Sequence, residues 1–250
     1  DSQGRAQLIH AELALDAEGK FLAVRLSGYG NLGAYITGVA PGPLSLNTGK
    51  NLASVYRTPL LGVDIKTVLT NTTLMGAYRG AGRPEATFGI ERIMDELAAE
   101  LNMDPLEVRE KNWIKHEEFP FTTVAGMTYD SGNYEAATAK AKELFDYDGL
   151  RAEQAERRER GDTVQLGIGV STFTEMCGLA PSRIMGELGG GAGGWEHAAI
   201  RMLPTGKVEV VTGSSAHGQG HETAWSQIVA DRLGVPFEDV EVLHGDTQSS

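Results

Sequence analysis

The sequence is poor in cysteine, in basic residues and in long apolar runs, and each shortage excludes a class of protein. A single cysteine, Cys177, among 250 residues excludes an internal disulfide framework and fits a reducing compartment, so we expect a cytoplasmic protein. No apolar run approaches the ~20 residues of a membrane-spanning helix, and the first residues show no signal-peptide pattern. With 22 Lys and Arg against 34 Asp and Glu, the net charge of −12 argues against nucleic acid or an anionic membrane as a partner.

The remaining composition is that of a globular protein with a sizeable core. Hydrophobic residues make up 41% and charged residues 22%. A chain of 250 residues suffices for one large domain or two ordinary ones. The sequence begins at Asp1 without a methionine and stops at Ser250 just after a strand-like segment. We therefore expect a piece of a longer polypeptide.

Alternation of apolar and polar residues predicts strands near the start of the chain. Two such runs, at 5–16 and 20–29, are joined by a plausible hairpin turn, and a third strand is predicted from 64 to 70. Residues 38–49 are rich in Gly, Pro and Asn, which predicts a loop.

Helical spacing follows in the middle of the chain. Pro84 suits the first turn of a helix, and an apolar stripe recurs after it, formed by Ile90, Ile93, Met94, Leu97, Ala98 and Leu101. Asp104 is predicted to cap a second, short helix. Residues 131–160 predict two helices, the first with Leu144 and Phe145 on its apolar stripe and the second highly charged.

The last third changes to β character. A helix is predicted from Thr223 to Leu233, with Trp225, Ile228 and Val229 facing inward. Strands are predicted at 165–176, 195–203, 207–212 and 239–244. Since sheet and helix mix without regular βαβ alternation, the predicted class is α+β. We divide the chain into 1–145, a charged helical connector at 146–162, and 163–250.

One glycine-rich run, Gly76–Glu85, leads directly into the predicted helix. It carries three glycines and two arginines. Glycine lets the backbone approach a ligand closely, and the N-terminus of a helix favours an anion. The pattern therefore indicates an anion-binding loop, although an ordinary loop with surface arginines has the same composition.

A second run, Gly213–Thr223, reads Gly-Ser-Ser-Ala-His-Gly-Gln-Gly-His-Glu-Thr. The two runs, in this order, resemble the large subunit of the molybdenum hydroxylases, the family of xanthine dehydrogenase, aldehyde oxidase and aerobic carbon monoxide dehydrogenase. The similarity extends through Gly194-Trp195-Glu196 and the closing His244-Gly245-Asp246-Thr247. The resemblance implies parts of two molybdopterin-binding α+β subdomains.

The resemblance also implies cofactor-binding residues. In the first run the backbone of Tyr78, Arg79 and Gly80 would touch the molybdenum cofactor. In the second run the Gly-Gln-Gly segment would hold the pterin, together with the helix start after it: Gly218, Gln219, Gly220, His221, Glu222 and Thr223. The side-chain amide of Gln219 has both the donor and the acceptor that a pterin edge requires.

Two positions bear on the substrate. Copper-containing carbon monoxide dehydrogenases of this family carry a cysteine where this chain has Gly80, and glycine offers no ligand atom for a soft metal. We therefore expect molybdenum without copper. Purine-oxidising relatives place an aromatic ring where this chain has Ala81, so a purine substrate is disfavoured. An aldehyde or an N-heterocycle is the expected substrate class.

The family further implies a molybdopterin cofactor, for which the cytosine dinucleotide is one form, and two partners: a medium subunit that binds FAD and a small iron–sulfur subunit. Water would supply the oxygen, and a dimer of heterotrimers is the expected assembly. A glycine-phenylalanine loop would precede Asp1, and the general-base glutamate would lie beyond Ser250. We expect no catalytic residue within this chain, and interpret Glu85 and Glu222 as helix-start carboxylates.

Other interpretations have weaker support. His217, His221 and Glu222 could form a zinc site at i, i+4 spacing, but only if a helix ran through Gly218 and Gly220. The run 189–194 lacks the signatures of a phosphate or dinucleotide loop and predicts a mobile connector. No serine lies in a Gly-x-Ser-x-Gly elbow. A non-catalytic scaffold that carries cofactor or contacts other subunits stays the alternative to an enzyme.

Overall fold

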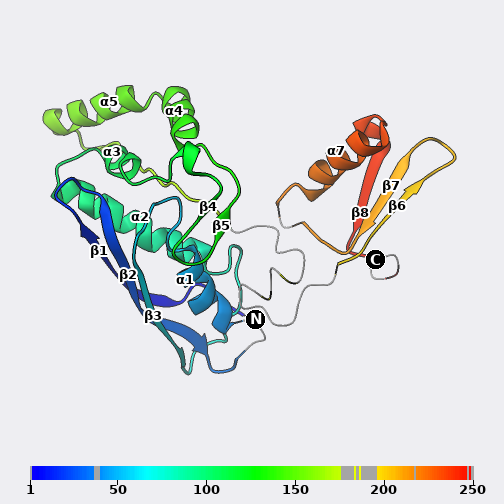
Figure 1. The fold of residues 1–250 in the computed structure, drawn as a ribbon, viewed down its shortest axis with the longest axis horizontal. Coiled ribbons are helices and arrows are strands. Elements are labelled where there is room, and N and C mark those ends of the chain that lie inside the picture. Colours follow the sequence, from blue (N-terminus) through cyan, green and yellow to red (C-terminus); the bar gives the residue numbers. More distant parts are fainter. Residues whose placement is uncertain are drawn as a thin grey trace. The chain divides into compact units, whose positions relative to one another are not determined.

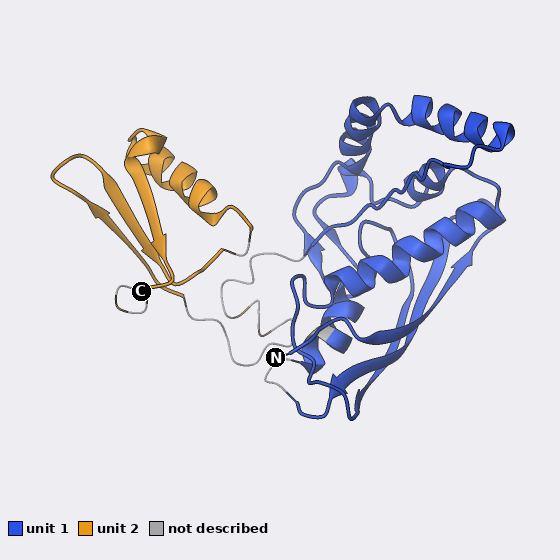
Figure 2. Cartoon of the chain, turned by 180° about the vertical axis from the view of Figure 1, so that it is seen from behind, with its two compact units in different colours: residues 1–176 blue, residues 177–250 orange. Residues whose placement is uncertain are grey.

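The computed structural model describes residues 2–36, 40–175, 183, 186, 196–216, 218–246 and 248. The chain forms two compact units, Asp1–Met176 and Cys177–Ser250 (Figure 2). Cys177, His217, Trp195 and the glycine run 189–194 lie outside the described residues. The predictions made for them have no structural counterpart to compare with.

The first unit is built on a three-stranded sheet in the order β1 (Gln7–Leu15), β2 (Phe21–Gly33), β3 (Leu61–Leu69). Strands β1 and β2 are antiparallel, and β2 pairs with β3 in parallel. The Asp16 carboxylate fixes the hairpin turn, because Oδ1 accepts hydrogen bonds from the amides of Glu18 and Lys20 at 3.0 and 2.8 Å. The predicted strands and hairpin are confirmed.

The connection from β2 to β3 is helical where a loop was predicted. It contains a π-helical turn, η1 (Gly42–Asn47), followed by α1 (Thr48–Asn51). Two parallel strands need a crossover, and this one buries Leu44 and Thr48 against the sheet. The prediction of a loop at 38–49 is therefore wrong for its described residues, because tertiary burial overrides the weak helix preference of Gly, Pro and Asn.

Helix α2 (Arg83–Glu100) runs along one face of this sheet (Figure 1). Ile90, Met94 and Ala98 are buried as the stripe predicts, at no more than 2% exposure. Gly89 permits the close approach, since a Cβ there would lie 3.2 Å from Leu26 Cδ1. Leu101 is 44% exposed, so its place in the stripe is wrong: it follows the last helical residue.

Four short elements complete the middle of the unit: α3 (Pro105–Glu110), η2 (His116–Glu118), β4 (Phe121–Thr122) and β5 (Thr128–Tyr129). Asp104 caps α3 as predicted, its Oδ1 accepting from the Leu106 amide at 2.8 Å.

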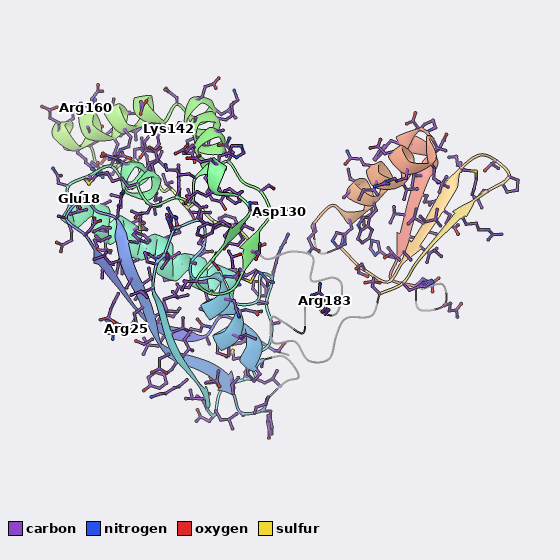
Figure 3. All side chains as sticks on the ribbon, viewed as in Figure 1. Glu18, Arg25, Asp130, Lys142, Arg160 and Arg183 are labelled. Carbon is purple, nitrogen blue, oxygen red and sulfur yellow. The ribbon has the colours of Figure 1, made fainter. Side chains whose placement is uncertain are left out.

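Two helices follow, α4 (Tyr134–Phe145) and α5 (Tyr147–Arg160). Both were predicted, but Leu144 and Phe145 are 75% and 71% exposed, so their assignment to a core-facing stripe is wrong for this chain. Helix α5 packs within the unit, where Gln154 is buried and donates to the Leu166 carbonyl at 2.8 Å. Arg160 near its end projects into solvent (Figure 3).

The segment after α5 is extended but unpaired. Strand character was predicted at 165–176, yet residues 165–175 form no ladder with any strand in the described part of the chain. Their packing is real, since Ile168 and Val170 contact the hydrophobic core of the unit. The alternation of apolar and polar residues therefore predicted the buried face correctly. It could not predict strand pairing, because pairing requires a neighbouring strand with a free edge.

The second unit is a small α+β layer of β6 (Ala198–Met202), β7 (Val208–Thr212), α7 (His221–Leu233), η3 (Phe237–Asp239) and β8 (Val240–His244). Helix α7 lies along β8 (Figure 1) and links the parallel pair β7 and β8. Val208, Val210 and Val229 form the core. Ile228 is 58% exposed, so its inward assignment is wrong, and Ser226 and Ala230 are buried in its place. Gly234 ends α7 with φ +69° as predicted.

Both units combine helices with mixed sheets, which confirms the α+β class. Among the helices in the described part of the chain, none combines the length and apolar character that a bilayer crossing requires.

Candidate functional site

The candidate residues fall into two groups, one in each compact unit. Tyr78–Ala81 lie in the turn immediately before α2, within what we call the arginine loop (residues 76–83). Three successive residues, Gly80, Ala81 and Gly82, have φ values of +92°, +47° and +98°. Glycine accepts such angles readily, but Ala81 is strained by them. The surrounding contacts must therefore hold the turn in place.

The carbonyl groups of this turn are all occupied by the protein. Ala81 N donates to the Tyr78 carbonyl at 2.6 Å, and Arg83 Nη1 donates to that of Gly80 at 3.1 Å. The remaining three acceptors are served by side chains from elsewhere in the unit: Arg5 on Arg79 O, Asn47 on Ala81 O at 2.9 Å, and Thr48 on Gly82 O at 3.3 Å.

The amide groups behave in the opposite way. The N–H groups of Arg79, Gly80 and Gly82 donate to no acceptor in the described part of the chain. Arg83 Nε is also buried without a partner there. With acceptors satisfied and donors free at a helix N-terminus, the turn fits an acceptor-rich, anionic group, as the phosphate and dithiolene of molybdopterin would be.

Gly80 has no space for a side chain in this turn. A Cβ at this position would lie 2.5 Å from Cγ and 2.6 Å from Cδ of Pro84, and 3.6 Å from the Glu175 carboxylate. No side chain fits there without a shift of backbone or proline ring. Glu85 follows in the first turn of α2, as expected of a helix-start carboxylate, and its Oε2 is buried without a partner among the described residues.

The second group surrounds the start of α7. Gly218 and Gly220 have φ values of +87° and +71°, and the helix begins at His221. The His221 ring stacks on Trp225 with centroids 4.4 Å apart, and its Nδ1 is buried without a partner in the described part of the chain. Thr223 is exposed in the first turn. This helix start therefore presents an unpartnered ring nitrogen and an exposed hydroxyl to which a polar group could bind.

Glu222 is held by a hydrogen bond to His244. Its Oε1 lies 2.7 Å from His244 Nε2 at the end of β8, which ties the start of α7 to the sheet. The hydrogen bond from His244 lowers the pKa of Glu222, assisted by its own backbone amide. Glu222 is thus an ionised helix-start carboxylate with a partner that the sequence did not reveal.

The zinc interpretation conflicts with this geometry. Because Gly218 and Gly220 adopt left-handed angles, the helix does not extend back through them, and helical i, i+4 spacing does not arise. Within the described residues, which do not include His217, no group of three His, Cys, Asp or Glu side chains is arranged to hold a metal.

The two parts of the sequence each match a known family. Residues 1–113 match one molybdopterin cofactor-binding domain model, and residues 140–250 match a second. The chain therefore belongs to the family of molybdopterin cofactor-binding domains found in the large subunits of molybdenum hydroxylases.

Relatives are large subunits of such enzymes. The carbon monoxide dehydrogenase large chain of Hydrogenophaga pseudoflava is 39% identical over 96% of this chain. The nicotine 6-hydroxylase large subunit of Paenarthrobacter nicotinovorans is 32% identical over 98%. The crystal structure of a Cu,Mo-CO dehydrogenase superposes on 99% of the chain, covering 32% of its own, with a TM-score of 0.82 and 35% identity. The chain spans about 30% of the length of these curated relatives.

Sequence reasoning missed the residues that hold the arginine loop. Asn47 and Thr48 lie in a segment predicted to be a loop, and Arg5 lies in a predicted strand. None carries a motif, because each reaches a backbone carbonyl that is far away in sequence. Tertiary contact alone reveals them.

Proposed function

We propose that the chain is the molybdopterin-binding portion of a molybdenum hydroxylase large subunit. The parent enzyme would hydroxylate an aldehyde or N-heterocycle with oxygen from water and pass electrons to iron–sulfur and FAD subunits. The isolated 250 residues would be inactive, since no catalytic residue is assigned within them. Tyr78, Arg79 and Gly80 would bind the cofactor in the first unit, and Gly218–Thr223 in the second.

One observation carries the proposal. In the arginine loop the carbonyl groups of residues 78–82 accept hydrogen bonds from the protein, whereas the N–H groups of Arg79, Gly80 and Gly82 have no acceptor among the described residues. Backbone donors fixed in this way bind anionic oxygen or sulfur without reorganisation, and the adjacent dipole of α2 adds to the attraction. When bound, the molybdenum cofactor supplies two-electron oxidation. The residues of this chain would bind it, orient it and balance its negative charge.

The finer assignments rest on the same resemblance. Ala81 leaves the substrate side of the loop without an aromatic ring, which favours a non-purine substrate. A cytosine dinucleotide form of the cofactor, a dimer of heterotrimers and a cytoplasmic location complete the proposal. The division into 1–145, 146–162 and 163–250 is also proposed. For comparison, the second family match begins at residue 140, and the first compact unit ends at residue 176 of the sequence.

We further propose that this site holds no copper, although a solved relative is a Cu,Mo enzyme. Gly80 supplies no thiolate, and the contact a Cβ would make with Pro84 leaves no space for one in this conformation. Elemental analysis of the natively purified enzyme tests this point. Copper in a one-to-one ratio with molybdenum would refute it.

The binding assignment is tested in the full-length polypeptide, produced with its partner subunits in a host that makes molybdopterin. Arg79→Ala and Gln219→Ala should each lose most of the bound molybdenum and pterin, measured by elemental analysis and by pterin fluorescence after release. Arg92→Ala is the control, because the partners of Arg92 in the described part of the chain are Asp95 and Glu96 on the exposed side of α2. Wild-type pterin content in both variants would favour the non-catalytic scaffold instead.

A further inference from the structure

The segment Gln3–Arg5 lies against the arginine loop. Gln3 and Met75 form a parallel β-bridge, in which Gln3 N donates to the Leu74 carbonyl at 3.0 Å and Gly76 N donates to the Gln3 carbonyl at 2.7 Å. One residue beyond Arg5, the Ala6 carbonyl accepts from the Asn31 amide of β2 at 2.9 Å. The segment is therefore anchored to the sheet on one side and to the start of the loop on the other.

Arg5 makes two contacts with the loop itself. Its Nη2 donates to the Arg79 carbonyl, and its guanidinium carbon lies 4.7 Å from the centroid of the Tyr78 ring. Arg5 adopts φ +59°, an angle that a non-glycine residue reaches only at a cost. A strained backbone held by two specific side-chain contacts indicates a defined role for this side chain.

Gly4 lets the segment Gln3–Arg5 approach Tyr78 closely. A Cβ at Gly4 would lie 2.7 Å from the Tyr78 Cβ. Any larger residue would push Tyr78 away, and with it the ring on which Arg5 lies.

Peptide geometry gives these contacts a consequence. In a trans peptide the carbonyl of one residue and the N–H of the next point in opposite directions. When Arg5 fixes the Arg79 carbonyl, it therefore also fixes the direction of the Gly80 N–H. Asn47 does the same for the Gly82 N–H through the Ala81 carbonyl.

We propose that Arg5 is a positioning residue that aims the free Gly80 N–H at the cofactor. The proposal rests on the proposed function of the arginine loop and deepens it. Arg5 itself does not need to touch the cofactor, since its hydrogen bond is made at the carbonyl edge of the peptide unit, opposite the N–H.

Trypsin provides a direct readout, because Arg5 holds the carbonyl of the Arg79–Gly80 bond that trypsin would cleave. In the full-length polypeptide, Arg5→Ala should speed cleavage at this bond by about tenfold, as expected from the loss of one charge-assisted hydrogen bond. Molybdenum and pterin content should fall together with loop protection. Arg5→Lys, which keeps a charged donor over the Tyr78 ring, should restore part of both.

Gly4→Ala is a second variant that disturbs Tyr78 without changing Arg5, and it should expose the same bond. Arg92→Ala should change neither cleavage nor cofactor content. Unaltered cleavage and cofactor content in Arg5→Ala would overturn the proposal, as would faster cleavage at wild-type content. If Gln219→Ala and Arg79→Ala lose cofactor while Arg5→Ala retains it, only the role of Arg5 fails. If all three retain it, the proposed function fails.

Discussion

The Arg109 guanidinium and the Glu91 carboxylate form a buried ion pair, with 2.9 Å between Nε and Oε2 and at most 7% of either side chain exposed. Arg109 also donates to the backbone carbonyls of Glu91 and Pro105 and to the Asp95 carboxylate. Burial is the largest single influence and would lower the pKa of Arg109, but the effects of Glu91, Tyr56 and Asp95 together outweigh it, and the pKa is raised. The pair joins α2 to α3 with its hydrogen-bonding groups satisfied.

Glu91 also anchors the unpaired segment after α5. Its Oε2 accepts from the Thr172 amide at 2.9 Å, and the Tyr56 hydroxyl donates to its Oε1. Burial, together with the Glu91 charge, raises the pKa of Tyr56 well above its ordinary value, so the hydroxyl remains a donor. Arg109→Met should destabilise the first unit by about 3–5 kcal/mol, because it leaves a buried carboxylate uncompensated.

Chemical denaturation of the wild-type and variant polypeptides measures that loss. Replacing both partners, as Glu91→Leu with Arg109→Met, should cost less than Arg109→Met alone, because no buried charge is left. Arg92→Ala, which removes only exposed pairs, should change the unfolding free energy by about 0–1 kcal/mol. A loss of that small size for Arg109→Met would contradict the prediction.

Gly80→Ala should reduce cofactor content and destabilise the loop by about 1–3 kcal/mol, the range for strained backbone conformations. Two effects act together there, the angle of +92° and the contact with Pro84. Gly19→Ala separates them, because Gly19 has φ +83° and nothing within 4 Å of its Cβ position. Thermal unfolding and molybdenum analysis of both variants check the prediction, which requires Gly80→Ala to be the more damaging.

Acid should weaken the second unit through Glu222. Its pKa is lowered in the folded state by the hydrogen bond from His244, so the unfolded chain binds the proton more readily. The contribution is therefore fully present above the ordinary pKa of 4.5 and lost as the pH falls through the lowered value. Glu222→Gln should flatten the stability profile of this unit below pH 4.5 in denaturation experiments. An identical pH slope in wild type and variant would rule out the hydrogen bond between His244 and Glu222 as the cause.

Asn112 should stabilise the first unit by hydrogen-bonding the backbone of β2 and the preceding turn to that of α3. Its Oδ1 accepts from the Phe21 amide at 2.8 Å, and its Nδ2 donates to the carbonyls of Gly19 and Val108. Asn112→Ala leaves these buried groups unpaired and should cost about 2–3 kcal/mol by chemical denaturation. Asn133→Ala, which removes only the exposed cap of α4, should cost about 1 kcal/mol. Equal losses in the two variants would show that burial of the Asn112 contacts adds nothing.

The sequence predicted the elements whose signals are local. The hairpin of β1 and β2, the stripe of Ile90, Met94 and Ala98, and the cap at Asp104 each depend on spacing within about one helical turn or one strand pair. The failures were of another kind. Leu44 and Thr48 became helical and buried, and Phe145 stayed exposed, because burial depends on what else in the fold lies nearby.

The sequence by itself determined the α+β class, the family and the two glycine-rich turns at the starts of α2 and α7. Motif residues are recognisable there because their chemistry requires those residue types at fixed spacing. Only the tertiary structure decided which groups of the arginine loop are hydrogen-bonded and which have no partner among the described residues. Arg5, Asn47 and Thr48 donate to its carbonyls from distant positions in the sequence. Every residue has a backbone carbonyl, so the sequence around the loop does not show which side chain will bind it.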